Sequence, residues 1–318
     1  MKEDNKKEDN KWMKFAVGEG LTKTVSSLFQ KLVGKIMGTL AMGCIASIII
    51  GAIQALSGFL GFVKRRQKDM NETLVPDLKS VSWAILFGFM ASIFGTIWSI
   101  YTFTLGADIG IRTLLISMSI IPGAFWDRIF WKEKMKLTQI CGIGVFLVSA
   151  WAMLDYPNLA LLLALPVWVP AVLVITFTQS INEALSRASS VKLNIWSNNF
   201  WVGLATIFFS IAALVILSLG SGGATLDLSK TFLLGVMAMG AIVIVMIAFK
   251  LLAYIGGGTI ALKKLVMQGT YLITSLVAGV LVYNEPFTNG KVVGILLFFI
   301  AFIMTDNKTR NTLKKLFS

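Results

Sequence analysis

Long apolar segments are the feature that most constrains how this chain can fold. Nine segments come close to the ~20 residues that an α-helix needs to cross the hydrocarbon core of a bilayer. Only 14% of the residues are charged, whereas soluble domains carry about 25%. We therefore expect an all-α integral membrane protein. The nine segments are residues 37–62, 83–105, 108–131, 137–155, 162–186, 194–219, 230–253, 258–283 and 290–305.

A tenth segment, residues 12–33, is selected by internal symmetry, although its three lysines and one glutamate lower its hydropathy. A first stretch runs from "LGADIGIRTLLISMSIIPG" to "GVFLVSAWAM", and a similar one from "IGGGTIALKKLVMQGTYLI" to "ILLFFIAFIM". Each contains a glycine-rich turn, a long helix with an early basic residue, a glutamate and a closing helix with glycine. The glutamates are Glu133 and Glu285, and the glycines are Gly142 and Gly294.

Matching the remaining segments in order leaves only residues 12–33 to correspond to 162–186. The chain then divides into two five-helix repeats, residues 12–156 and 157–306. Because each repeat has an odd number of helices, the second copy must insert with the opposite orientation, as in inverted-repeat transporters. The predicted fold is ten transmembrane helices arranged as two inverted repeats.

The distribution of basic residues predicts the orientation. The net charge of +13 would suggest nucleic acid in a soluble protein, but here the basic residues fall in alternate loops such as "KRRQKD" and "KEKMK". The opposite loops, "DYPN" and "NEPFTNG", are acidic or neutral. The positive-inside rule then places both termini in the cytoplasm, as a disordered tail at 1–11 and a basic tail at 307–318. A nine-span chain would keep the orientation of the later helices but place the N-terminus outside.

Composition also argues against several function classes. Histidine is absent, and Cys44 and Cys141 lie in apolar segments, so we expect neither a metal, a cofactor nor a disulfide framework. An intramembrane enzyme would need a base or an acidic cluster that the sequence lacks, and no repeated pore loop indicates a channel. A non-transporting membrane protein stays open. The N-terminus resembles neither a cleavable signal nor a transit peptide, which favours a prokaryotic plasma membrane, with the chain as a monomer or homodimer.

The two closing segments, "FWKEKMKLTQICGIGVFLVSAWAML" and "VYNEPFTNGKVVGILLFFIAFIM", resemble the drug/metabolite transporter superfamily, in its EamA-like and nucleotide-sugar/triose-phosphate branches. The resemblance covers most of the chain. It implies transport of a small polar metabolite by alternating access around a central cavity. The alternative within the same superfamily is a proton-coupled, EamA-type exporter of amino acids or cationic drugs.

A narrower resemblance concerns "IWSNNFW" and "IALKKL", which stand where nucleotide-sugar transporters carry motifs opening the seventh and ninth helices. This resemblance implies that Asn198, Asn199 and Lys264 bind substrate, and that the substrate is anionic or sugar-nucleotide-like. Three positions depart from the motifs, namely Ser197, Ile260 and Lys263.

Helical phase separates the two adjacent lysines. Lys264 begins a polar stripe that continues, at helical spacing, through Gln268, Tyr271 and Ser275. Polar stripes on membrane helices usually face the bundle interior or a water-filled cavity, so we expect this stripe to contact substrate. Lys263 points about 100° away, and we expect it to reach along the helix to the inner membrane surface. That explanation is also open for Lys264.

Arg112 and Glu19 are charged positions within predicted helices. Arg112 lies near the outer end of its helix, where positive-inside bias gives no reason for a cation, so it is a candidate substrate contact; a local pair with Asp108 is the alternative. Glu19 is a candidate for ion coupling, because an intramembrane carboxylate is functional by default. Its alternative is a pair with Lys23 one turn later.

Gln179, Asn182 and Glu183 share one face of the helix predicted over 162–186. We expect the two amides to contact substrate and Glu183 to be a second possible coupling residue. Neutralisation of Glu183 by Arg187 is the alternative, and interhelical hydrogen bonding is the simpler explanation for any single amide, Asn198 and Asn199 included.

Overall fold

In the computed structural model, the described residues are 11–132, 137–153, 155–156, 166–221 and 228–305, and they contain helices but no β-strand. Residues 1–10 of the first predicted tail, the whole of the second tail and Glu133 lie outside these residues. The helices are α2 (Lys11–Ile36), α3 (Leu40–Arg66), α4 (Leu78–Met90), η1 (Ala91–Ile97), α5 (Trp98–Thr104), α6 (Ile109–Ser117), α7 (Ile120–Phe130), α8 (Leu137–Met153), α10 (Trp168–Ser189), α11 (Ile195–Ser221), α12 (Lys230–Ile255), α13 (Ile260–Tyr283) and α14 (Asn289–Thr305).

Six helical stretches of the described chain are long and apolar enough to cross a membrane, which agrees with the prediction of an all-α multi-pass membrane protein. Hydrocarbon favours helices because they satisfy their own backbone hydrogen bonds. The six stretches are Leu40–Arg66, Leu78–Thr104, Ile109–Phe130, Ile195–Leu219, Lys230–Ile255 and Lys263–Tyr283.

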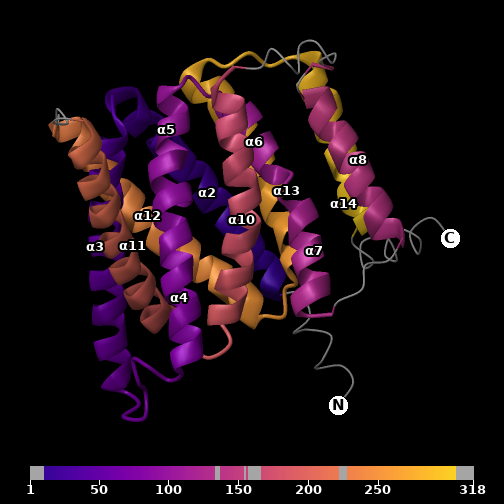
Figure 1. Cartoon of the computed structure of the whole chain (residues 1–318). Coiled ribbons are helices and arrows are strands. Elements are labelled where there is room, and N and C mark those ends of the chain that lie inside the picture. The colour runs from indigo at the N-terminus through magenta and orange to yellow at the C-terminus, as the bar shows by residue number, and fades with distance from the viewer. Residues whose placement is uncertain (1–10, 133–136, 154, 157–165, 222–227, 306–318) are drawn as a thin grey trace, which may run out of the picture.

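Successive helical stretches run in opposite directions along one bundle (Figure 1). We call the end where α2, α4, α11 and α13 begin the lower end, and the opposite end the upper end, as they appear in Figure 1. Side-chain caps fix several starts: Asp77 accepts a hydrogen bond from the Ser80 amide at 3.1 Å, and Asp108 from the Ile111 amide at 2.9 Å. Such caps satisfy amides that have no partner inside the helix.

Two turns have the same backbone geometry at opposite ends of the bundle. Between α5 and α6, Gly106 has φ +91°, and between α12 and α13, Gly257 has φ +89°. Each amide donates to the carbonyl three residues earlier, Phe103 at 3.1 Å and Tyr254 at 3.0 Å. Both positions require glycine because side-chain-bearing residues rarely adopt this left-handed conformation.

The packing places α2, α6, α10, α12 and α13 around the centre of the bundle. α2 packs against α12 and α13, while α10 packs against α4, α6 and α7. α3 pairs closely with α11, and α8 with α14. The α8–α14 pair lies to one side in Figure 1.

Two crossings predicted as continuous helices are interrupted. The first changes to the π-helix η1 between α4 and α5. The second breaks between α6 and α7, at Met118 and Ser119. Pro122 explains the second break, because its nitrogen carries no hydrogen for the Met118 carbonyl of a continuous helix. π-helical segments occur frequently at functional sites, and η1 lies in the middle of this bundle.

Gly203→Ala tests the close α3–α11 packing. A Cβ atom at Gly203 would lie 2.8 Å from the Gly51 carbonyl oxygen and would also meet the backbone of Ala55, so the two helices must separate. We expect a loss of about 1–3 kcal/mol in the free energy of unfolding, measured by denaturation in detergent. Gly144→Ala on α8 is the matched control, because its Cβ would meet nothing within 4 Å. Equal stability of the two variants would contradict this packing.

Candidate functional site

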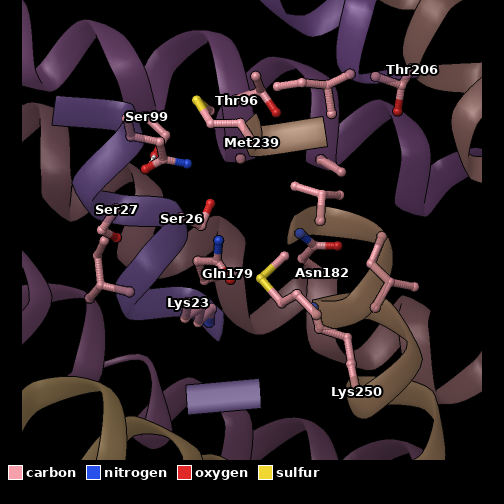
Figure 2. A pocket seen from close by; sticks show the side chains of 18 of the residues that line it. Lys23, Ser26, Ser27, Thr96, Ser99, Gln179, Asn182, Thr206, Met239 and Lys250 are labelled. Carbon is pink, nitrogen blue, oxygen red and sulfur yellow. Dashed lines mark hydrogen bonds between the residues drawn. The ribbon is translucent and has the colours of Figure 1, made fainter. Parts of the chain in front are cut away.

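A polar cavity lies in the middle of the bundle, between α2, α3, α4, η1, α5, α6, α10, α11, α12 and α13 (Figure 2). Its empty volume, including the opening, is about 840 Å³. The π-helix η1 contributes Ala91, Gly95 and Thr96 to the wall. The polar and charged lining residues are Lys23, Ser26, Ser27, Gln30, Gln54, Thr96, Ser99, Arg112, Gln179, Asn182, Thr206, Lys250 and Tyr271.

Arg112 is a buried cation on the cavity wall, with 2% of its surface exposed. Its Nε donates to Thr102 Oγ1 at 3.0 Å, another guanidinium nitrogen donates to Ser99 Oγ, and the guanidinium carbon lies 4.6 Å from the centre of the Phe103 ring. The alternative pair with Asp108 is wrong, since that carboxylate caps α6 instead. Arg112 therefore has hydroxyl partners and, among the described residues, no carboxylate within ion-pair distance.

Lys23 is the second cation on this wall that lacks a carboxylate partner within the described chain. Its Nζ lies 3.6 Å from Met267 Sδ and 5.8 Å from the centre of the Tyr271 ring. The Tyr271 hydroxyl is 2.5 Å from Ser27 Oγ, which is also on the wall. The predicted alternative, a pair between Lys23 and Glu19, is not formed, because Glu19 pairs with a different lysine.

A buried ionic network lies on the lower side of the cavity. Lys263 Nζ is 2.7 Å from Glu19 Oε2 and 2.7 Å from Glu183 Oε2. Lys250 Nζ is 3.2 Å from Glu183 Oε1, and the Tyr254 hydroxyl donates to Glu183 Oε2 at 2.5 Å. We call these five residues the Glu183 network; their side chains come from α2, α10, α12 and α13.

The network corrects the expectation that Lys263 reaches the membrane surface, because its exposed fraction is 0%. Its ammonium also lies 4.6 Å from the centre of the Tyr254 ring. Two carboxylates from distant parts of the sequence provide the negative charge that allows this burial. Helical phase could not show this, since α13 packs against α2, α6, α7, α10 and α14 and is covered on several sides.

Lys264 and Gln268 contact the break between α6 and α7 and do not line the cavity. Lys264 Nζ donates to the Ser119 carbonyl at 3.1 Å and to Ser119 Oγ at 3.0 Å. Gln268 Nε2 is 3.5 Å from the same Oγ, and Ser117 Oγ is 3.5 Å from Gln268 Oε1. These two residues provide partners for backbone and hydroxyl groups where the helix is interrupted. Of the predicted stripe on α13, Tyr271 lines the cavity.

Asn198 and Asn199 are fully buried on α11 but are not part of the cavity wall. Asn199 Oδ1 accepts from Gln54 Nε2 at 3.2 Å, so it positions a residue that does line the cavity. No described residue hydrogen-bonds the Asn198 side-chain amide. Asn199 therefore contacts a residue of the cavity wall without lining the cavity itself.

The predicted face of α10 divides between the cavity and the network. Gln179 and Asn182 line the cavity, and Asn182 Oδ1 is buried without a hydrogen-bond partner among the described residues. Glu183 belongs to the network. Arg187 does not neutralise it, because Arg187 pairs with Asp127 at 2.7 Å.

Near each end of the bundle, a carboxylate joins a cation to a helix N-terminus. At the upper end, Glu285 lies 2.6 Å from Lys31 Nζ and accepts from the Ile109 amide of α6 at 2.9 Å. Burial opposes the charge of Glu285, but these hydrogen bonds hold its pKa below the usual value. We call this group the upper clasp.

The lower clasp has the same chemistry. Asp127 Oδ1 lies 2.7 Å from Arg187 and accepts from the Ile260 amide of α13 at 3.2 Å. An acidic group is favoured at a helix N-terminus because the helix dipole is positive there.

Sequence reasoning missed three groups at this site. Lys250 lies on the cavity wall, and its signal was a lysine within the apolar segment 230–253, three residues before the end of that segment. Lys31 is the cation of the upper clasp and Asp127 is the carboxylate of the lower clasp. No local sequence pattern indicated that they pair with Glu285 and Arg187. Within the described residues no three His, Cys, Asp or Glu side chains are grouped as around a metal ion.

Comparison with known proteins bears on the fold alone. No family model matches this chain, and no curated protein matches it. Among 28 matching chains of solved structures, one described as "Crystal structure of protein" aligns with a TM-score of 0.65 and 14% sequence identity. The alignment covers 95% of this chain and 98% of that one. The likeness extends over nearly the whole length of both chains.

Lys263→Met and Lys264→Met make the same change at adjacent buried positions with different partners. We expect Lys263→Met to lower the free energy of unfolding by about 3–5 kcal/mol, because it leaves two buried carboxylates with one fewer cation. Lys264→Met should cost about 1–3 kcal/mol, since it removes hydrogen bonds to Ser119. Denaturation of the purified variants in detergent measures both. A larger loss for Lys264→Met would contradict the network.

Proposed function

We propose that this chain is a secondary transporter that carries a small anionic metabolite by alternating access around the central cavity. The observation that carries the proposal is the presence of Arg112 and Lys23 on the cavity wall, each without a carboxylate partner among the described residues. An uncompensated charge inside a membrane bundle is unfavourable, and an anion that enters the cavity relieves it.

The charge balance around the cavity supports an anionic substrate. The cavity and the Glu183 network together hold two carboxylates, Glu19 and Glu183. Four cations belong to the cavity wall or the network, an excess of two positive charges: Lys23, Lys250, Lys263 and Arg112. The same balance disfavours the alternative of a cationic-drug exporter, because a cation would enter beside like charges.

The helix contacts support ten spans in two inverted repeats. In the proposed correspondence, α2 matches α10, α3 matches α11, α4 to α5 matches α12, α6 to α7 matches α13, and α8 matches α14. Contacts then occur in exchanged pairs: α2 with α12 and α10 with α4, or α3 with α12 and α11 with α4. The two glycine turns, at Gly106 and Gly257, also occupy corresponding positions.

The clasps support alternating access, because the same correspondence exchanges them. One carboxylate follows α13 and joins α2 to the start of α6; the other lies in the last turn of α7 and joins α10 to the start of α13. Opening one clasp while the other stays closed would expose the cavity to one side at a time. Transporters built from inverted repeats alternate in this manner.

Membership of the drug/metabolite transporter superfamily and a location in the prokaryotic plasma membrane belong to this proposal. The lower end then faces the cytoplasm, because the last turn of α3 carries Lys64, Arg65 and Arg66 and the loop after it carries Lys68. Ion coupling by Glu19 and Glu183 is also part of this proposal, because both carboxylates belong to the Glu183 network.

Uptake into proteoliposomes tests the substrate class. Wild-type protein should take up at least one compound from a set of phosphate- or carboxylate-bearing metabolites, and unlabelled anions, but not cations of similar size, should compete. Lys23→Gln and Arg112→Gln should each lower uptake by about 10-fold or more, as expected for loss of a hydrogen-bonding charged group. Lys68→Gln, at the exposed lower loop, is the control. Competition by cations alone would contradict the proposal.

Thiol labelling tests the clasps. In a background of Cys44→Ser and Cys141→Ser, a reporter at Ser26→Cys places a thiol on the cavity wall. Because each clasp closes one end, Glu285→Gln should increase labelling by an impermeant reagent from the upper side, and Asp127→Asn from the lower side.

Glu72→Gln is the control for the clasp experiment, since Glu72, in the loop after α3, pairs with Arg65 in the last turn of α3 and accepts a hydrogen bond from Asn194, so it belongs to neither clasp. Labelling from the same side in both clasp variants would be inconsistent with two opposed closures.

A further inference from the structure

Lys250 belongs both to the cavity wall and to the Glu183 network. It lies on α12, and both Lys250 and Lys23 line the cavity; Figure 2 shows Lys250 at the lower right of the view and Lys23 towards the left. Its Nζ lies 3.2 Å from Glu183 Oε1 and 5.1 Å from the centre of the Phe87 ring, which also lines the cavity. The same ammonium group therefore faces both a carboxylate and the space where an anion would bind.

Glu183 does not depend on Lys250 alone for its charge to be tolerated. Its Oε2 atom lies 2.7 Å from Lys263 Nζ and accepts from the Tyr254 hydroxyl at 2.5 Å. The contact with Lys250 is longer, and Oε1 accepts no hydrogen bond from the described residues. Lys250 is thus the partner that Glu183 can release most easily.

The Glu183 network separates two hollow regions. Lys250 faces the central cavity, whereas Tyr254, one turn later on α12, lines a pocket among the loops of the lower end. We call this the lower pocket; it has an empty volume of about 1390 Å³, and Arg65, Trp131 and Arg187 contribute to its wall. The ionic contacts of Glu183 lie between the residues that face each region.

We propose that Lys250 is a third anion-binding residue of the cavity, and that it exchanges Glu183 for the anionic group of the substrate when the cavity fills. The proposal rests on the proposed function, since it needs an anion in the cavity. The flexible four-carbon stem of lysine permits such a change of partner. With Lys23 and Arg112, three cations then face the substrate, which fits a phosphate ester or a dicarboxylate better than a monoanion.

The exchange would weaken the ionic contacts that separate the cavity from the lower pocket. Once Lys250 contacts the substrate, Glu19 and Glu183 share the single cation Lys263. Two carboxylates with one cation repel each other more strongly, so the contacts between α2, α10 and α13 weaken. An occupied cavity therefore loosens the separation from the lower pocket, whereas an empty cavity holds it closed.

Binding measurements on four proteins test the exchange. The full chain in detergent is titrated with inorganic phosphate and with pyrophosphate by calorimetry, as wild type, Glu183→Gln, Lys250→Met and the double variant. Glu183→Gln should bind about 5- to 10-fold more tightly, because it frees Lys250 from its competing carboxylate. Lys250→Met should bind about 10-fold more weakly, and the double variant should match Lys250→Met.

The outcomes separate this inference from the proposed function. If wild type binds neither probe, both the anion-carrier proposal and the exchange are contradicted. If wild type binds and Glu183→Gln binds no more tightly, the exchange alone is overturned. Lys250→Arg is the second comparison in case Glu183→Gln fails to fold: it keeps the cation and should bind within about 3-fold of wild type, and equal binding by Lys250→Met and Lys250→Arg would overturn the exchange.

Discussion

The burial of Lys263 between two carboxylates is the interaction on which the centre of the bundle depends. Glu19 comes from α2, Glu183 from α10 and Lys263 from α13, so one ammonium group joins three helices that are distant in sequence. In a membrane, apolar side chains give little preference for one helix neighbour over another, because lipid is equally apolar. A buried ion triplet is specific, since each group is unfavourable in any arrangement that separates it from the others.

The cavity wall carries cations that this triplet does not neutralise. Lys23 and Arg112 have hydroxyl, sulfur or aromatic neighbours, and Lys250 shares Glu183 with Lys263. The cavity is therefore cationic, whereas the charges of the Glu183 network beside it balance one another. In our proposal, the substrate supplies the missing negative charge, and the clasps decide which end of the bundle admits it. The π-helix η1 contributes Ala91, Gly95 and Thr96 to the cavity wall, and such segments occur frequently at functional sites.

The sequence was sufficient to predict helical spans and the polar face of α10, because both depend on local periodicity. Arg112, marked in the sequence because positive-inside bias does not explain a cation near the predicted outer end, lines the cavity and does not pair with Asp108. The two adjacent lysines were misassigned because helical phase gives a direction but not the partner in that direction. Lys263 meets Glu19 and Glu183, and Lys264 meets a break in another helix, and both partners depend on tertiary packing.

Ser26 offers the most direct test of whether the cavity is the anion site of a carrier. In proteoliposomes of a cysteine-free variant with Ser26→Cys, the alkylation rate of this cavity thiol is measured with and without a transported anion. The account predicts that the anion slows alkylation at concentrations that half-saturate its uptake, and that a cation of similar size does not. Unchanged alkylation while the same anion saturates transport would contradict it.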